Sequence, residues 1–147
     1  MDQEIASLAV MREINGNSYS LYDHAFYVIG GLELSLDSIR AVSALLAPDF
    51  SIFDDTVLNV SAGAVDKFKE LRTSGKSKDE AQYWANMLPI GDLLTYVHDK
   101  EEKSAIAVFI EENWSRLLQR FVNSCAVTRI IDGDDADEIY ITVSVAI

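Results

Sequence analysis

The sequence has few residues that could hold a small protein together through a disulfide or a metal ion. Its 147 residues include one cysteine and two histidines, and also only two prolines. A lone cysteine, Cys125, excludes an intramolecular disulfide framework and is typical of a reducing compartment. His24 and His98 lie far apart in the sequence and do not have the spacing of a zinc site. The chain must therefore fold around an apolar core, and its length suits one domain.

Positive charge is also scarce. Twelve Lys and Arg face 24 Asp and Glu, which gives a formal net charge of −12. Duplex nucleic acid and anionic lipid both bind through neutralising cations, so neither is expected to be the main partner. No apolar run is long enough to span a membrane, and the first residues, Met1 to Glu4, are acidic where a secretory signal is basic. These features predict a cytoplasmic protein.

The amino-terminal segment predicts a hairpin. Asn15-Gly16 separates two apolar runs, and this dipeptide favours a two-residue hairpin turn between about 5–14 and 18–29. A helix over Ile5–Glu13 is the alternative, because its apolar residues also recur with a period near 3.6.

Helices and one short strand are expected in the middle of the chain. The expected elements are a helix from Ser35 to before Pro48, a strand over 51–60, and helices over 61–73, from Ser77 to Pro89 and over about 100–122. Ser77 and Asp99 each begin a capping-box pattern, while 90–97 is ambiguous. The apolar faces of the last two helices place Trp84, Phe109 and Trp114 in the core.

The carboxyl-terminal segment predicts a second hairpin, with strands over 127–131 and 139–145 around an acidic loop. Alternation along 139–145 indicates one buried face. Sheet segments at both ends with helices between them favour one α+β domain over 1–147. We expect a mainly antiparallel sheet, built from both terminal hairpins and the short strand, with about four helices packed on it.

The acidic loop is the first candidate site, because five of the seven residues 132–138 are carboxylates. Calcium prefers six to eight oxygen ligands, but the loop does not follow the EF-hand pattern. The simplest interpretation is a solvated hairpin tip, and no metal or other cofactor is expected. A contact with a basic partner is the third interpretation.

No catalytic residue is predicted. The sequence contains no phosphate-binding loop, dinucleotide fingerprint or nucleophile elbow. Five cations lie within 67–78 beside Tyr83 and Trp84, a combination that binds single strands in other proteins. The surrounding negative charge instead favours a solvated helix face, with a tryptophan of the core lying beneath it.

The negative charge is uneven along the sequence. Residues 1–60 carry 2 basic and 9 acidic side chains, and residues 128–147 carry 1 and 5. If these segments share a sheet, the negative electrostatic potential would be concentrated at the edge loops of that sheet and would attract a cationic partner. The residues predicted to contact that partner are Asp54, Asp55, Asp132, Asp134, Asp135 and Asp137.

These features favour a small non-enzymatic inhibitor that neutralises a basic protein by covering its active site. A bacterial immunity protein against a nuclease toxin has this profile of size and charge, although no family motif supports the analogy. The first alternative is a homo-oligomerising structural or regulatory module, with a homodimer formed through the uncharged strand 139–147 if that strand lies at a sheet edge. The second alternative is a metal-dependent enzyme that uses the acidic loop.

Overall fold

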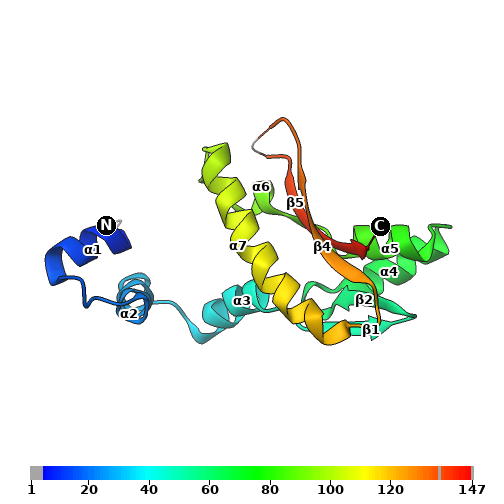
Figure 1. Cartoon of the computed structure of the whole chain (residues 1–147), viewed down its shortest axis with the longest axis horizontal. Coiled ribbons are helices and arrows are strands. Elements are labelled where there is room, and N and C mark those ends of the chain that lie inside the picture. Colours follow the sequence, from blue (N-terminus) through cyan, green and yellow to red (C-terminus); the bar gives the residue numbers. More distant parts are fainter. Residues whose placement is uncertain (1–4, 136, 147) are drawn as a thin grey trace. The chain divides into compact units, whose positions relative to one another are not determined.

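The computed structural model describes residues 5–135 and 137–146. The chain divides into two compact units, Met1–Ala41 and Val42–Ile147, here called unit 1 and unit 2 (Figure 1). Both helices and antiparallel strands are present, so the α+β class is confirmed. The strands form two small sheets rather than one, and seven α-helices occur in the described part of the chain rather than about four.

Unit 1 is helical, so the predicted amino-terminal hairpin is wrong and the helical alternative is right. Helix α1 spans Leu8–Asn15 and helix α2 spans Leu21–Leu32. Gly16 has φ +89° and ends α1, since glycine adopts this conformation without strain. Ser20 opens α2 with a capping box to Asp23. The Asn-Gly dipeptide therefore ends a helix here, a role that requires the same backbone freedom as a hairpin turn.

The predicted strand 51–60 is a complete hairpin. Helix α3, Leu36–Leu46, begins where Ser35 accepts the Ser38 N–H at 3.1 Å, as expected. Strands β1, Phe50–Phe53, and β2, Thr56–Asn59, then pair antiparallel. Asp54 and Asp55 both have positive φ, and they form the turn that the alternation did not reveal.

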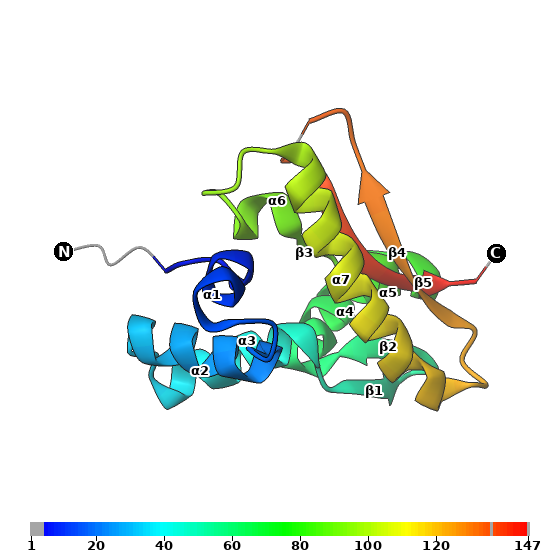
Figure 2. The same cartoon turned by 60° about the vertical axis from the view of Figure 1, so that its left-hand side comes forward.

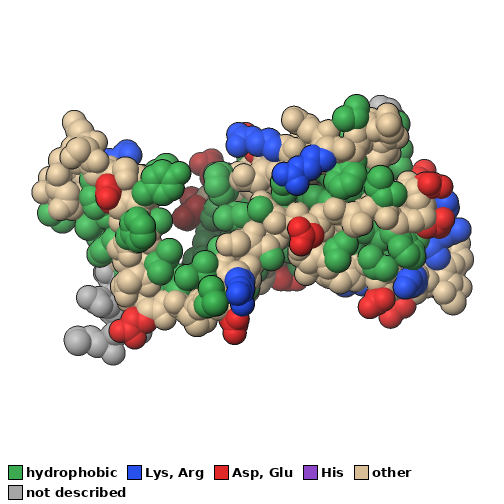
Figure 3. Space-filling model, turned by 90° about the horizontal axis from the view of Figure 1, so that it is seen from below, with side chains coloured by type: hydrophobic (Ala, Val, Ile, Leu, Met, Phe, Trp, Pro, Cys, Tyr) green, Lys and Arg blue, Asp and Glu red, His purple; other side chains and the backbone are tan. Residues whose placement is uncertain are grey.

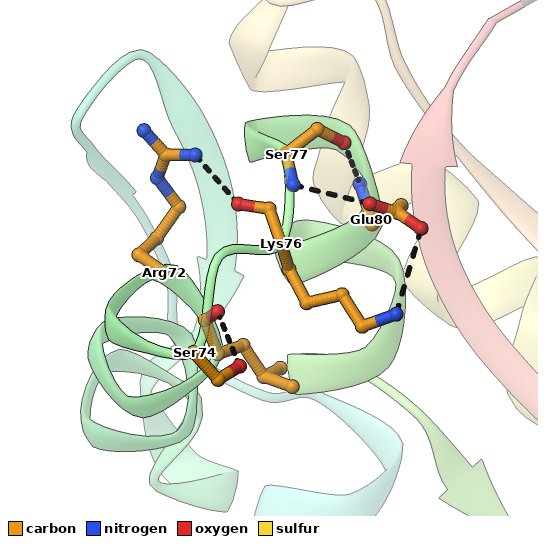
Figure 4. Close-up of polar contacts among 6 residues, drawn as sticks. Arg72, Ser74, Lys76, Ser77 and Glu80 are labelled. Carbon is orange, nitrogen blue, oxygen red and sulfur yellow. Dashed lines mark hydrogen bonds and ion pairs between the residues drawn. The ribbon is translucent and has the colours of Figure 1, made fainter.

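Helices α4 and α5 form a pair whose connection is closed by side-chain contacts (Figure 4). A 3₁₀ turn, η1 (Val60–Ala62), leads into α4, Ala64–Thr73, and α5 spans Lys78–Ala85. Arg72 donates to Lys76 O at 2.7 Å. The predicted capping box of α5 is confirmed: Glu80 N donates to Ser77 Oγ at 3.2 Å, and Ser77 N donates to Glu80 Oε2 at 3.1 Å.

The central sheet lies between helices on its two faces. Its strands run in the order β3 (Leu88–Pro89), β5 (Ile139–Val145) and β4 (Ala126–Asp132), all antiparallel. One face packs on α7, Lys100–Leu118, which is followed by the 3₁₀ turn η2 (Gln119–Phe121). On the other face, Thr142 of β5 donates its hydroxyl proton to the carbonyl of Tyr83 in α5. Both faces of β5 are thus buried, which corrects the expectation of one buried face.

The carboxyl-terminal strand is not an edge strand. Strand β5 pairs with β4 along seven residues on one side, and on the other side its residues Tyr140 and Ile141 pair with β3. Val143 in its middle is 0% exposed. Strand β5 is therefore the middle strand of the described sheet rather than an edge, while the homodimer itself stays a prediction.

The core of unit 2 contains Trp114 but neither Trp84 nor Phe109. Trp114 is 1% exposed and donates from Nε1 to Leu45 O at 2.9 Å. Trp84 is 51% exposed and Phe109 56% exposed, so their predicted core positions are wrong. Among the described residues, none of the helices combines the length and apolarity needed to cross a membrane.

Candidate functional site: the acidic pole

Three segments of unit 2 meet at one end of that unit. They are helix α6 (Ile90–Leu93), the first turn of α7, and the loop between β4 and β5, which lie together at the top of Figures 1 and 2. All nine acidic side chains of these segments are exposed. They are Asp92, Asp99, Glu101, Glu102, Asp132, Asp134, Asp135, Asp137 and Glu138, which with Lys100 and Lys103 we call the acidic pole.

Lys103 anchors the loop to the helices. Its side chain is 2% exposed, and Nζ donates to Asp137 Oδ1 at 2.7 Å and to Gly91 O at 3.3 Å. The hydrogen bond from Lys103, and then its charge, hold the pKa of Asp137 below the ordinary value. Gly91 packs so closely that a Cβ would lie 2.3 Å from the Asp137 carbonyl oxygen. One buried lysine thus joins α6, α7 and the loop.

A second lysine fixes the other side of the loop. Lys100 Nζ lies 3.1 Å from Asp132 Oδ1 and also donates to the Gly133 carbonyl. Within the loop, Gly133 N donates to Glu138 O at 2.9 Å, which continues the β4–β5 ladder. Backbone bonds and two lysines therefore anchor the described residues of the loop to the helices and to the β4–β5 ladder.

The first turn of α7 adds two acids with no ion pair among the described residues, Glu101 and Glu102. Asp99 caps the helix by accepting the Glu101 N–H at 2.9 Å. The predicted capping box does not form among the described residues, because Asp99 accepts from Glu101 rather than from Glu102 and no carboxylate returns to the Asp99 N–H. Acids at a helix amino terminus are stabilised by the helix dipole, so they can gather here at low cost.

The structure does not bring the six predicted contact residues together. Asp132, Asp134, Asp135 and Asp137 lie in the pole, whereas Asp54 and Asp55 lie at the opposite end of unit 2, in the β1–β2 turn (Figures 1 and 2). There Lys78 Nζ lies 3.0 Å from Asp54 Oδ1 and 3.6 Å from Asp55 Oδ2. The hydrogen bond to Asp54 is the main cause that raises the pKa of Lys78.

Charge in unit 2 collects in the acidic pole. The pole has nine acidic and two basic residues, a net charge of −7, while unit 2 as a whole has 18 and 10, a net charge of −8. The rest of unit 2 is thus close to balance, at −1. Figure 3 shows the side of the molecule away from the pole, where acidic and basic side chains lie next to one another.

The expectation that the two acidic terminal segments share a sheet is wrong. The segment 1–60 contributes three helices and the separate hairpin β1–β2, while only the carboxyl-terminal segment enters the central sheet. The pole instead combines the carboxyl-terminal loop with α6 and α7. Sequence reasoning did not select Glu101, Glu102 or Lys103. A signal for Lys103 existed, because it lies one helical turn before Ala107 on the buried stripe of α7.

The other candidates do not form a reactive cluster. Within residues 5–135 and 137–146, no three His, Cys, Asp or Glu side chains are close enough to hold a metal ion. Cys125 is exposed, although a lone cysteine between a helix and a strand is expected to be a small buried residue, and its φ is +53°. The cations of 67–78 lie on α4, in the turn to α5 and at the first residue of α5, and among them Lys76 and Lys78 pair with acids.

Comparison with known proteins gives no relative. No protein family, no curated protein and no solved structure matches this chain.

Proposed function

We propose that this protein is a non-enzymatic binding protein whose acidic pole covers a basic surface of another protein. The observation that carries the proposal is the placement of charge: −7 in the pole against −1 in the rest of unit 2. An exposed cluster of one sign speeds the capture of a partner of the opposite sign, and like charge repels wrong partners.

The contacts that anchor the described residues of the pole support the same proposal. Lys100 and Lys103 hold the loop through the contacts described above, while Glu101, Glu102, Asp134 and Asp135 remain exposed. A surface that is already ordered loses less conformational freedom on binding than a mobile one. The exposed carboxylates can therefore meet a partner with little rearrangement of the loop.

The partner class follows from the charge. Proteins that act on nucleic acid carry basic clefts that bind phosphates, and an acidic surface can cover such a cleft without catalytic residues. The specific form that we propose is an inhibitor that neutralises a nuclease-type toxin, as a bacterial immunity protein does.

The experiment compares two variants of equal charge. The pole variant carries Glu101→Gln, Glu102→Gln, Asp134→Asn and Asp135→Asn. The control variant carries Glu13→Gln, Asp66→Asn, Glu70→Gln and Glu112→Gln, all exposed positions outside the pole. Each variant has four fewer negative charges than wild type. Tagged wild type and both variants are used for native affinity capture from the source cells, and the bound proteins are identified by mass spectrometry.

We expect wild type and the control variant to capture the same basic protein, and the pole variant to lose most of it. The captured protein is then assayed for nuclease activity with and without wild type. Equal capture by the pole and control variants would overturn the role of the pole. Capture of a basic protein whose nuclease activity is absent, or unaffected by wild type, would overturn the inhibitor form of the proposal.

A further inference from the structure

Strand β4 has an outer edge that no described strand pairs with. In the order β3–β5–β4 it is the last strand, and its register with β5 is unbroken over seven residues (Figure 2). Such an edge presents backbone N–H and C=O groups to any extended chain that lies beside it.

The hydrogen-bond pattern shows which residues present these groups. Ala146 N donates to Cys125 O at 2.7 Å, and Gly133 N donates to Glu138 O at 2.9 Å. In an antiparallel ladder the pairing alternates, so odd-numbered residues of β4 bond to β5 and even-numbered ones face away. The backbone groups of Thr128 and Ile130 are therefore directed outward.

The edge lacks the usual protection against pairing. Strand β4 contains no proline, lysine or bulge. Its one arginine, Arg129, donates to Ser144 Oγ and, at 3.3 Å, to Val145 O of the neighbouring strand. The guanidinium group is thus held over the β4–β5 pair.

A groove lies beside the start of β4. It has a volume of about 580 Å³ and lies between α7 and β4. Its lining includes Ser115 and Leu118 of α7, Val122 after η2, and Val127 of β4. Val122 is 83% exposed and Val127 37% exposed, so the groove offers apolar surface to alternate side chains of an added strand.

Charge distinguishes between the occupants of this edge. Strand β4 ends at Asp132, within the acidic pole of net charge −7. A second copy of the chain would bring another net charge of −12 against this surface. An extended segment with basic residues near one end complements both the edge and the pole.

We propose that β4 is the docking edge for an extended basic segment of the partner protein, which adds to the sheet as a strand beside Thr128 and Ile130. Its apolar side chains enter the groove against α7, and its cations meet the pole near Asp132. Main-chain hydrogen bonds supply affinity and the groove supplies selectivity in this mode of recognition. The inference rests on the proposed function for the identity of the partner.

The test uses a displayed library of random peptides of about ten residues, the upper end of the usual range of strand lengths. Selection on wild type is followed by binding to Thr128→Pro and Thr128→Val. Proline removes the outward N–H without removing a bond to β5, while valine keeps it and controls for the lost hydroxyl contact to Glu111. Amide hydrogen exchange of Thr128 and Ile130 in wild type gives a second measurement that does not depend on a variant that folds.

We expect selected peptides to alternate apolar residues and to carry Lys or Arg near one end. Their affinity for Thr128→Pro should be about tenfold weaker than for Thr128→Val, because proline removes one well-formed backbone hydrogen bond to the peptide. They should also slow exchange of both amides. Absence of selected peptides, or peptides that leave both amides unprotected, would overturn the proposal. If the Thr128 and Ile130 amides are already protected without peptide and light scattering shows a dimer, the proposal is overturned and the edge is occupied by a second copy of the chain.

The two proposals fail in different ways. If the pole variant loses a captured basic protein that leaves the Thr128 and Ile130 amides unprotected, the pole binds the partner and the edge does not. If selected peptides protect these amides while the pole and control variants capture proteins equally, the edge is a docking site and the proposed function is wrong.

Discussion

Replacing Lys103 separates the cost of burying a charge from the benefit of pairing it. Its side chain is 2% exposed, while that of its partner Asp137 is 77% exposed. Taking an ammonium group out of water is costly, and one hydrated carboxylate offsets only part of that cost. Methionine has nearly the same length and volume as lysine, and Lys103→Met leaves Asp137 in contact with water rather than buried and unpaired.

Lys103→Met also leaves the buried Gly91 carbonyl without its donor, a cost that opposes the gain from removing the buried charge. We therefore expect the unfolding free energy of Lys103→Met to lie within about 2 kcal/mol of the wild-type value. Lys103→Ala also leaves a cavity beside α7 and should lose about 2–4 kcal/mol. Asp137→Asn leaves the ammonium group buried without its charge partner and should be less stable than wild type. Urea unfolding followed by tryptophan fluorescence measures all three variants. A Lys103→Met protein as unstable as Lys103→Ala would refute the reasoning.

The same ion pair has a defined pH dependence. Because Lys103 lowers the pKa of Asp137 in the folded state, the carboxylate stabilises the fold above its unfolded pKa. This contribution is lost as the pH falls through the lowered folded-state value. The stability difference between wild type and Asp137→Asn should be full at neutral pH and should disappear in strong acid, well below the ordinary pKa of about 4. A difference that persists there would mean that Asp137 acts through something other than its charge.

Four further predictions concern packing and exposure. Gly91→Ala should lose about 1–3 kcal/mol in urea unfolding, because its methyl group would meet the backbone of the acidic loop. In Gly30→Ala the added methyl group meets open space on α2, so this variant should be more stable than wild type by up to about 1 kcal/mol. An equal loss of stability in Gly91→Ala and Gly30→Ala would contradict the packing described for Gly91. Asn86→Ala should lose about 2–4 kcal/mol, since it leaves a buried N–H and a buried carbonyl of β2 without partners; a loss within about 0.5 kcal/mol would argue against these bonds. Acrylamide should quench the fluorescence of Trp84, which is 51% exposed, more strongly than that of Trp114, which is 1% exposed. The variants Trp84→Phe and Trp114→Phe each leave one of these two tryptophans, so the quenching of each is measured separately.

Local signals in the sequence predicted the elements that depend on local chemistry. Ser35 and Ser77 cap helices as expected, because a hydroxyl bond to a nearby N–H is formed within one turn. The carboxyl-terminal hairpin is also confirmed, over Ala126–Asp132 and Ile139–Val145. Each of these patterns involves residues that are neighbours in the sequence or across one loop.

Features that depend on tertiary packing were not predictable in the same way. The dipeptide Asn15-Gly16 suits both a hairpin turn and a helix end, and only the following capping box at Ser20 favours the helix. The second buried face of β5 exists because α5 packs there, a contact between segments far apart in the sequence. The acidic pole likewise joins three segments through Lys100 and Lys103, so its charge could not be summed from any one stretch.

The salt dependence of association with the captured basic protein tests the central claim most directly. Association rates are measured by stopped flow for wild type, the pole variant and the control variant between about 0.05 and 0.5 M salt, a range over which the Debye length shrinks severalfold. We predict that the rate for wild type and the control variant falls about tenfold or more across this range. The pole variant should associate more slowly at low salt and with a clearly weaker salt dependence. Identical, salt-insensitive rates for all three proteins would contradict the account.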